Sequence, residues 1–184
     1  MPIETDEPVL DKERLLDVVH YICSKCDPAE LGNVKLHKVL YFADMLHFVG
    51  TGRALTGGEY QKQRFGPCAR HLTWAICQLR DNGRLEVRQR DFHGFIKMDY
   101  IGRGEVRYVP LGNYVIPLLN DVIDFVCRHS AKEISELSHN AAWEAVKLGD
   151  RIPYFTAYWM QLPEVTDEDV AAAEVELRSI PEFA

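Results

Sequence analysis

The decapeptide KLHKVLYFAD places three side chains able to transfer or share protons on one stripe of a predicted helix. His37, Tyr41 and Asp44 follow one another at spacings of four and three residues, and such spacings bring side chains to the same helical face. A histidine, a phenol and a carboxylate together could form an acid-base site, a binding surface or an internal hydrogen-bond network. The elements that position these side chains decide among the three.

The spacing favours an internal network over an active site. His37 and Asp44 are two turns apart, roughly 10 Å along a helix axis, and cannot bond directly. Tyr41 lies between them, and apolar residues occupy the adjoining face. We therefore expect Tyr41 and Asp44 to be buried or half-buried and to bond to His139 or to a backbone turn near Thr56.

Cys68 is the candidate for nucleophilic chemistry. It follows Gly66 and Pro67, and proline suits the first turn of a helix, here predicted over residues 67–82. Free backbone N–H groups there would lower the pKa of a thiol, and His71 lies three residues on. A thiol enzyme also needs an oriented base and an oxyanion hole. The sequence specifies neither, so this function is an alternative and we assign no catalytic residue.

No pattern indicates a metal or a cofactor. Cys23 and Cys26 have the C-x-x-C spacing, with His20 nearby, but a zinc site needs two further clustered ligands. The sequence offers no second pair, so ordinary cysteines at a helix end are the favoured interpretation. The glycine-rich GTGRALTGG lacks the context of a phosphate loop.

A DNA-binding regulator is the second alternative. A helix over residues 67–82 followed by strands has the outline of a winged helix, whose wing could contact phosphates. The wing arginines would be Arg88, Arg90, Arg103 and Arg107. We favour a solvated face instead, because the helix exposes few base-reading side chains: Arg70, Gln78 and Arg80.

Hydrophobic periodicity predicts a mainly α (α+β) fold, a single helical domain over residues 1–184 with a small antiparallel sheet or hairpin. Asp11 is the expected N-cap of the first helix, and Ser130 with Glu133 forms an expected capping box. Helices are predicted at 9–25, 34–49, 67–82, from 113, at 131–149 and, appended after Thr166, within 164–184. Strands are predicted at 59–65, 84–90, 95–101 and 105–111.

Composition places the chain among ordinary globular proteins. Of 184 residues, 47% are hydrophobic and 27% charged, which suits one domain. An acidic N-terminus, the lack of a long apolar run and an odd count of five cysteines favour a reducing cytoplasm. The net charge is −7, although residues 51–115 hold 11 Lys/Arg against 6 Asp/Glu. We expect neither membrane nor nucleic acid as a partner.

The ordered motifs together resemble the SocA-like antitoxin family, also called the Panacea domain. The resemblance extends over residues 10–160 and includes a Lys-Leu-x-Lys helix, a Leu-Thr-Gly turn, a Gly-Pro step and a later Ser-His block. Two positions depart from the family pattern, which more often has glutamine at His37 and an aliphatic residue at Cys68. The second departure weakens a catalytic role for Cys68. The matching residues are Lys35, Leu36, Lys38, Tyr41, Phe42, Asp44, Gly57, Tyr60, Gly66, Pro67, Ser138, His139 and Trp143.

The resemblance implies a non-enzymatic antitoxin that neutralises a cognate toxin by direct binding. The matching residues are then a fold signature rather than an interface. For the interface we consider the aromatic segment with Tyr154, Phe155, Tyr158 and Trp159, because aromatic anchors dominate protein–protein binding; these rings could equally cap the core. The acidic C-terminal helix could attract a basic toxin or simply pack on the body. The toxin's identity and the oligomeric state, including a homo-oligomer, stay open.

Overall fold

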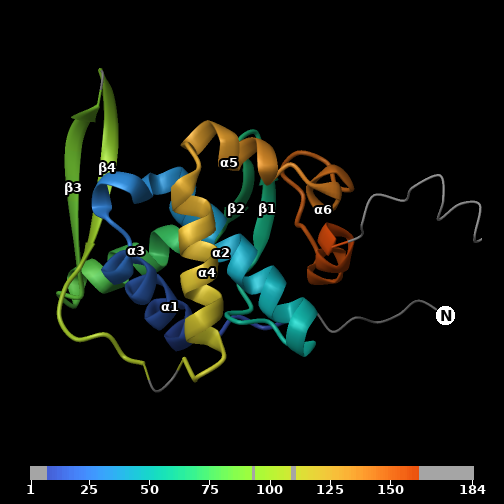
Figure 1. Ribbon diagram of the computed structural model, residues 1–184, viewed down its shortest axis with the longest axis horizontal. Helices are drawn as coiled ribbons and strands as arrows, with labels where there is room; N and C mark the ends of the chain where they lie inside the picture. The colour runs from blue at the N-terminus through green and yellow to red at the C-terminus, as the bar shows by residue number, and fades with distance from the viewer. Residues whose placement is uncertain (1–7, 93, 109–110, 162–184) are drawn as a thin grey trace, which may run out of the picture.

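The computed structural model describes residues 8–92, 94–108 and 111–161, and their fold is mainly helical with two small antiparallel sheets. The predicted α+β class is confirmed. The central element is α2 (Pro28–Thr51), which contacts α4, β4, β2, η1, α5 and α1 and lies in the middle of the molecule (Figure 1). This position explains why its side chains are buried on more than one side.

The first two helices begin where local sequence signals place them. In α1 (Lys12–Lys25) the Asp11 carboxylate accepts from the Arg14 N–H, as predicted. Gly32 interrupts α2 with a φ of 58°, so its main part begins just after this glycine. The predicted helix over residues 34–49 corresponds to that part.

The prediction of a helix over residues 67–82 is wrong at its start. Gly66–Ala69 is instead strand β2, paired antiparallel with β1 (Tyr60–Gln63), and α3 begins only at Leu72 (Leu72–Asp81). Gly66 closes the β1–β2 turn with a φ of 90°. The fixed φ of proline fits an edge strand as well as a first helical turn, so pairing with β1 decides the outcome.

The second sheet is a long hairpin. Strand β3 (Leu85–Phe92) pairs with β4 (Phe95–Gly102), from Leu85 opposite Gly102 to Phe92 opposite Phe95. The base of β4 packs on α1 and α2, while the tip projects from the body (Figure 1). The strand predicted at 105–111 is wrong for its described part, because residues 105–108 have no strand conformation.

The C-terminal half wraps around α2 with shorter elements. The Ser130 hydroxyl and Glu133 form the predicted capping box at the start of α5. The helix predicted over residues 131–149 is instead two short helices, separated by residues 138–140, and the second ends at Glu144. Beyond it, the Gly149 N–H and the Asp150 carbonyl bond to Lys62 of β1. The elements are α4 (Val115–Arg128), α5 (Ala131–Leu137), α6 (Ala141–Glu144) and the 3₁₀ helix η1 (Tyr154–Gln161).

The core gathers around α2 and includes Leu36, Leu40, Ile22, Leu79 and Leu119, which are at most 1% exposed. None of the described helices is both long and apolar enough to cross a membrane. The predicted C-terminal helix after Thr166 lies outside the described residues.

Candidate functional site

Asp44 is the centre of a closed hydrogen-bond network inside the fold. Its buried carboxylate accepts from the backbone N–H groups of Leu55 at 2.7 Å and Thr56 at 2.9 Å. The Thr56 hydroxyl bonds to the other carboxylate oxygen, and the Tyr60 hydroxyl lies 2.9 Å from it. Asp44 therefore holds the glycine-rich loop and β1 against α2. The predicted contact with the turn near Thr56 is confirmed.

Electrostatics show why this network is poorly suited to proton transfer. Burial raises the pKa of Asp44, while the bonds from Thr56 and Tyr60 oppose this shift. Burial and the Asp44 charge raise the pKa of Tyr60 far above its usual value, and they act in the same direction on the pKa of Tyr154. Both phenols therefore keep their protons at neutral pH. The network can position backbone and side chains, and its donors are already used.

Tyr41 is fully buried and connects α2 with the C-terminal segment. Its hydroxyl lies 3.5 Å from Asn140 Oδ1 and 3.6 Å from Met160 Sδ. Burial raises the pKa of Tyr41 to about 12, and its ring meets the Tyr60 ring edge-on at 5.4 Å. The sequence predicts His139 as the partner of Tyr41, whereas the structure shows Asn140, the next residue along the chain.

A second polar cluster joins the Lys-Leu-x-Lys helix and the Gly-Pro step to the later Ser-His block. The buried Lys38 ammonium donates to the Pro67 carbonyl at 2.8 Å, and burial lowers the pKa of Lys38 to about 8. A Cβ on Gly66 would lie 2.1 Å from Ser138 Oγ and 2.8 Å from Lys38 Nζ. These contacts leave room only for glycine at this position. The Ser138 hydroxyl donates to the Ser135 carbonyl, which fixes its place.

His139 and Trp143 are signature residues that are only half-buried. Their rings stack at 4.0 Å with an interplanar angle of 17°. The Lys62 ammonium lies 3.8 Å from the centre of the Trp143 ring, and the indole N–H donates to the Gln63 carbonyl at 3.3 Å. This stack ties α6 to β1 through a cation–π contact.

The remaining signature residues also lie at packing contacts. Leu36 is in the core, and the Phe42 ring meets Phe125 of α4 at 6.0 Å. Lys35 is buried except for 6% of its surface and pairs with Glu30 at 3.5 Å. Gly57 has a φ of 68°, and a Cβ there would collide with the backbone of residue 9. All these side chains lie where they can hold elements together.

Cys68 has neither the place nor the chemistry predicted for a nucleophile. It lies in β2 rather than in a helical first turn, and burial raises the pKa of its thiol. His37, rather than His71, lies 3.7 Å from the sulfur. Its Nδ1 accepts from the Ala69 N–H at 3.0 Å, and burial lowers the pKa of His37 to about 4. A base with a lowered pKa is poorly suited to activate a thiol whose own pKa is raised.

The two C-x-x-C cysteines do not act as a pair. Cys23 is buried in the core, and the Cys26 sulfur lies 2.9 Å from that of Cys127 on α4. Cys127 is 101 residues away in sequence, so spacing gave no signal for this contact. Within the described parts of the chain, no group of three or more His, Cys, Asp or Glu residues could hold a metal ion.

The arginines of the predicted wing have carboxylate partners within the molecule. Arg88 and Arg103 both bond to Glu86, and Arg90 pairs with Asp99 at 3.0 Å. Arg107 lies 3.5 Å from Asp17 of α1. A phosphate would have to compete with these carboxylates, which favours the solvated-face interpretation.

The aromatic segment is divided between core and surface. Tyr154 is 1% exposed, and its hydroxyl donates to the Gly58 carbonyl at 2.9 Å. It therefore supports the segment from inside and cannot itself present a contact surface. Phe155, Tyr158 and Trp159 are 39%, 49% and 40% exposed. We call these three residues the η1 patch.

Comparison with known families identifies the chain's class. Residues 36–144 match the family described as Antitoxin SocA-like, Panacea domain. This match covers more than half of the chain and contains both polar clusters, and the chain belongs to this family. No match was found among curated proteins or among solved structures.

Proposed function

We propose that this protein is an antitoxin that neutralises a cognate toxin in the cytoplasm by direct protein–protein binding, without catalysis. The observation that carries the proposal is the family match over residues 36–144. The buried signature supports it physically, because Asp44, Lys38 and Tyr41 are used inside the fold. Such an arrangement gives a rigid scaffold, and a stoichiometric inhibitor benefits from a preorganised surface.

We place the toxin contact at the η1 patch. The Phe155 and Trp159 rings meet edge-on at 5.8 Å, and Tyr158 lies 5.8 Å from Phe48 of α2. Tyr154 anchors the same helical turn in the core. The patch thus presents large aromatic side chains at low entropic cost, and such side chains are frequent binding hot spots. The chemistry fits a partner with an apolar pocket.

Growth rescue tests the function. The gene adjacent to that of this protein is expressed from an inducible promoter, with and without the chain. We expect the product of the adjacent gene to stop growth when it is expressed alone. Co-expression of this protein should restore growth. A neighbour that is harmless alone would contradict the proposal for that pair.

Paired variants test the surface. Phe155→Ser with Trp159→Ser should abolish rescue while the protein stays folded, because both anchors are lost. The matched control is Phe95→Ser with Ile96→Ser at the hairpin tip, where the side chains are 77% and 74% exposed. Figure 1 shows β3–β4 and η1 at opposite ends of the view. Loss of rescue in the hairpin variant alone would place the interface there instead.

A further inference from the structure

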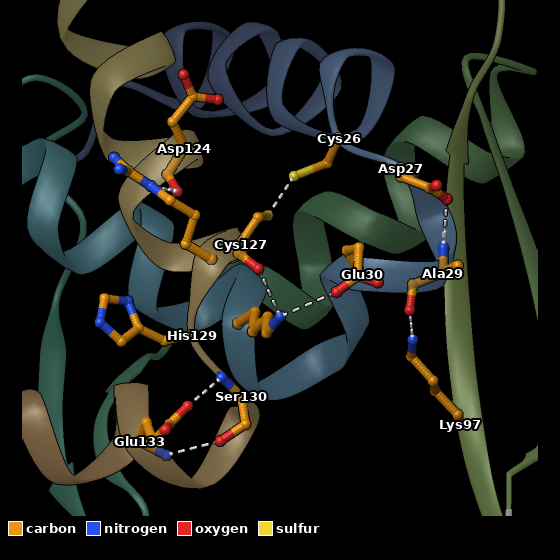
Figure 2. Close-up of polar contacts among 12 residues, drawn as sticks. Cys26, Asp27, Ala29, Glu30, Lys97, Asp124, Cys127, His129, Ser130 and Glu133 are labelled. Atoms are coloured by element: carbon orange, nitrogen blue, oxygen red, sulfur yellow. Dashed lines mark hydrogen bonds and ion pairs between the residues drawn. The ribbon is translucent and has the colours of Figure 1, made fainter.

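Two cysteines from distant parts of the chain meet at the ends of two helices. Cys26 caps the C-terminus of α1, and Cys127 lies in the last turn of α4. Their sulfur atoms are 2.9 Å apart and point toward each other, as Figure 2 shows. Both are free thiols. Packing alone does not require two thiols at this distance, and two thiols this close can be oxidised to a disulfide.

The surroundings make the two thiols unequal. The sulfur–sulfur hydrogen bond with Cys26, in which either thiol can donate, lowers the pKa of Cys127. Burial, Glu30 and Asp124 oppose this shift, and the Lys35 ammonium adds to it. The same bond and burial raise the pKa of Cys26. The Lys35 ammonium is held in place, because it donates to the Cys127 carbonyl at 3.2 Å. Because the Lys35 ammonium is held beside Cys127, it favours the thiolate form of this residue.

Access from solvent is also unequal. Cys127 is half-buried and lines an open surface depression together with Asp124 and Arg128. Cys26 lies behind it and is 7% exposed. A small oxidant in the depression can reach Cys127 first, and Cys26 is then in position to attack the product.

We propose that Cys26 and Cys127 form an oxidation site at which a hydroperoxide closes a reversible disulfide between α1 and α4. The Cys127 thiolate attacks one peroxide oxygen, the O–O bond breaks, and Cys127 becomes a sulfenic acid while hydroxide leaves and takes up a proton. The Cys26 sulfur then attacks the Cys127 sulfur, and the sulfenic hydroxyl leaves as water with the Cys26 proton. In sum, two thiols and one hydrogen peroxide give one disulfide and two water molecules.

The bond has a structural consequence. Closing it requires the two sulfurs to approach by about 0.9 Å from their 2.9 Å separation. It joins residues 101 apart in sequence, and cross-links over long loops restrict the unfolded chain most. We expect the thermal midpoint of the oxidised protein to rise by roughly 5–10 °C.

Thiol counting with intact mass measurement tests the site. Treatment of the full chain with one equivalent of hydrogen peroxide should lower the reactive thiols under denaturing conditions from five to three. The mass should fall by about two daltons, with a Cys26–Cys127 linked peptide, and a dithiol reductant should reverse both changes. The matched control Cys77→Ser removes a half-buried cysteine on α3 and should leave the linkage intact.

A trapping experiment separates the two roles. Cys26→Ser should stop at the sulfenic acid on Cys127, which a cyclic diketone probe then labels. Cys127→Ser should prevent both linkage and labelling at Cys26, and circular dichroism verifies that each variant is folded. The proposal is overturned if the wild-type chain keeps five thiols, if the linkage involves another cysteine, or if the probe labels Cys26 before Cys127.

Discussion

Asp44 carries the clearest prediction for a single residue. Asp44→Asn replaces one acceptor oxygen by an NH₂ group that faces the N–H and hydroxyl donors of Leu55, Thr56 and Tyr60. The new amide donor then faces other donors inside the fold and has no acceptor. This unsatisfied arrangement should lower the free energy of unfolding by about 2–4 kcal/mol. Chemical denaturation measures this change directly.

Asp121→Asn is the matched control for Asp44. Asp121 is an exposed carboxylate on α4, and surface substitutions of this kind usually change stability by less than about 0.5 kcal/mol. Equal effects of the two changes would show that the Asp44 network does not stabilise the fold.

His37 makes stability depend on pH in a defined window. Burial lowers its pKa from 6.5 to about 4, so between these values the unfolded chain binds a proton that the folded chain does not. The free energy of unfolding should therefore fall as the pH drops through this range, by at most about 3 kcal/mol. His37→Gln should flatten this part of the profile, because glutamine does not titrate. An unchanged profile would contradict the assignment.

Gly66 is the critical position of the β1–β2 turn. Gly66→Ala introduces a Cβ that would lie 2.1 Å from Ser138 Oγ, at a φ of 90°. The combined strain and collision should reduce the free energy of unfolding by about 3–5 kcal/mol, measured by denaturant titration.

Gly83→Ala isolates the collision at Gly66 from the backbone strain. Gly83 has a φ of 76°, and a Cβ there meets nothing within 4 Å. We expect only the backbone cost, about 1–2 kcal/mol. Equal losses at the two glycines would argue against the close contact between Gly66 and Ser138, the residue that follows α5.

Capping residues and hydrophobic spacing correctly predicted the elements that depend on short-range interactions. The Asp11 cap, the Ser130 capping box and the main part of α2 depend on residues within one or two helical turns. The error at Pro67 has a non-local cause, because β2 exists through its pairing with β1. The end of α6 was missed for the same reason, since residues 149–152 bond to β1 instead of continuing a helix.

The candidate site was predictable in part for comparable reasons. The stripe with Tyr41 and Asp44 could be inferred from spacing, and so could its bond to the turn at Thr56. The position of Tyr154 in the core and the contact between Cys26 and Cys127 could not. Both depend on which distant segments fold against each other.

The charge distribution of the molecule leads to a prediction about DNA. The chain has a net charge of −7, and the hairpin arginines pair with Glu86 and Asp99. We expect no retardation of DNA from its own promoter, even at about 50 mM salt, where phosphate contacts are strong. A saturable shift that weakens with salt and is lost on Arg88→Ala with Arg90→Ala would support the regulator alternative.

Direct binding is the central claim, and equilibrium titration of the purified chain with the purified product of the adjacent gene tests it most directly. We predict a saturable complex of defined stoichiometry that Phe155→Ser with Trp159→Ser weakens at least about tenfold, while Phe95→Ser with Ile96→Ser leaves it unchanged. Growth rescue by the chain without any measurable complex between the two purified proteins would contradict the account.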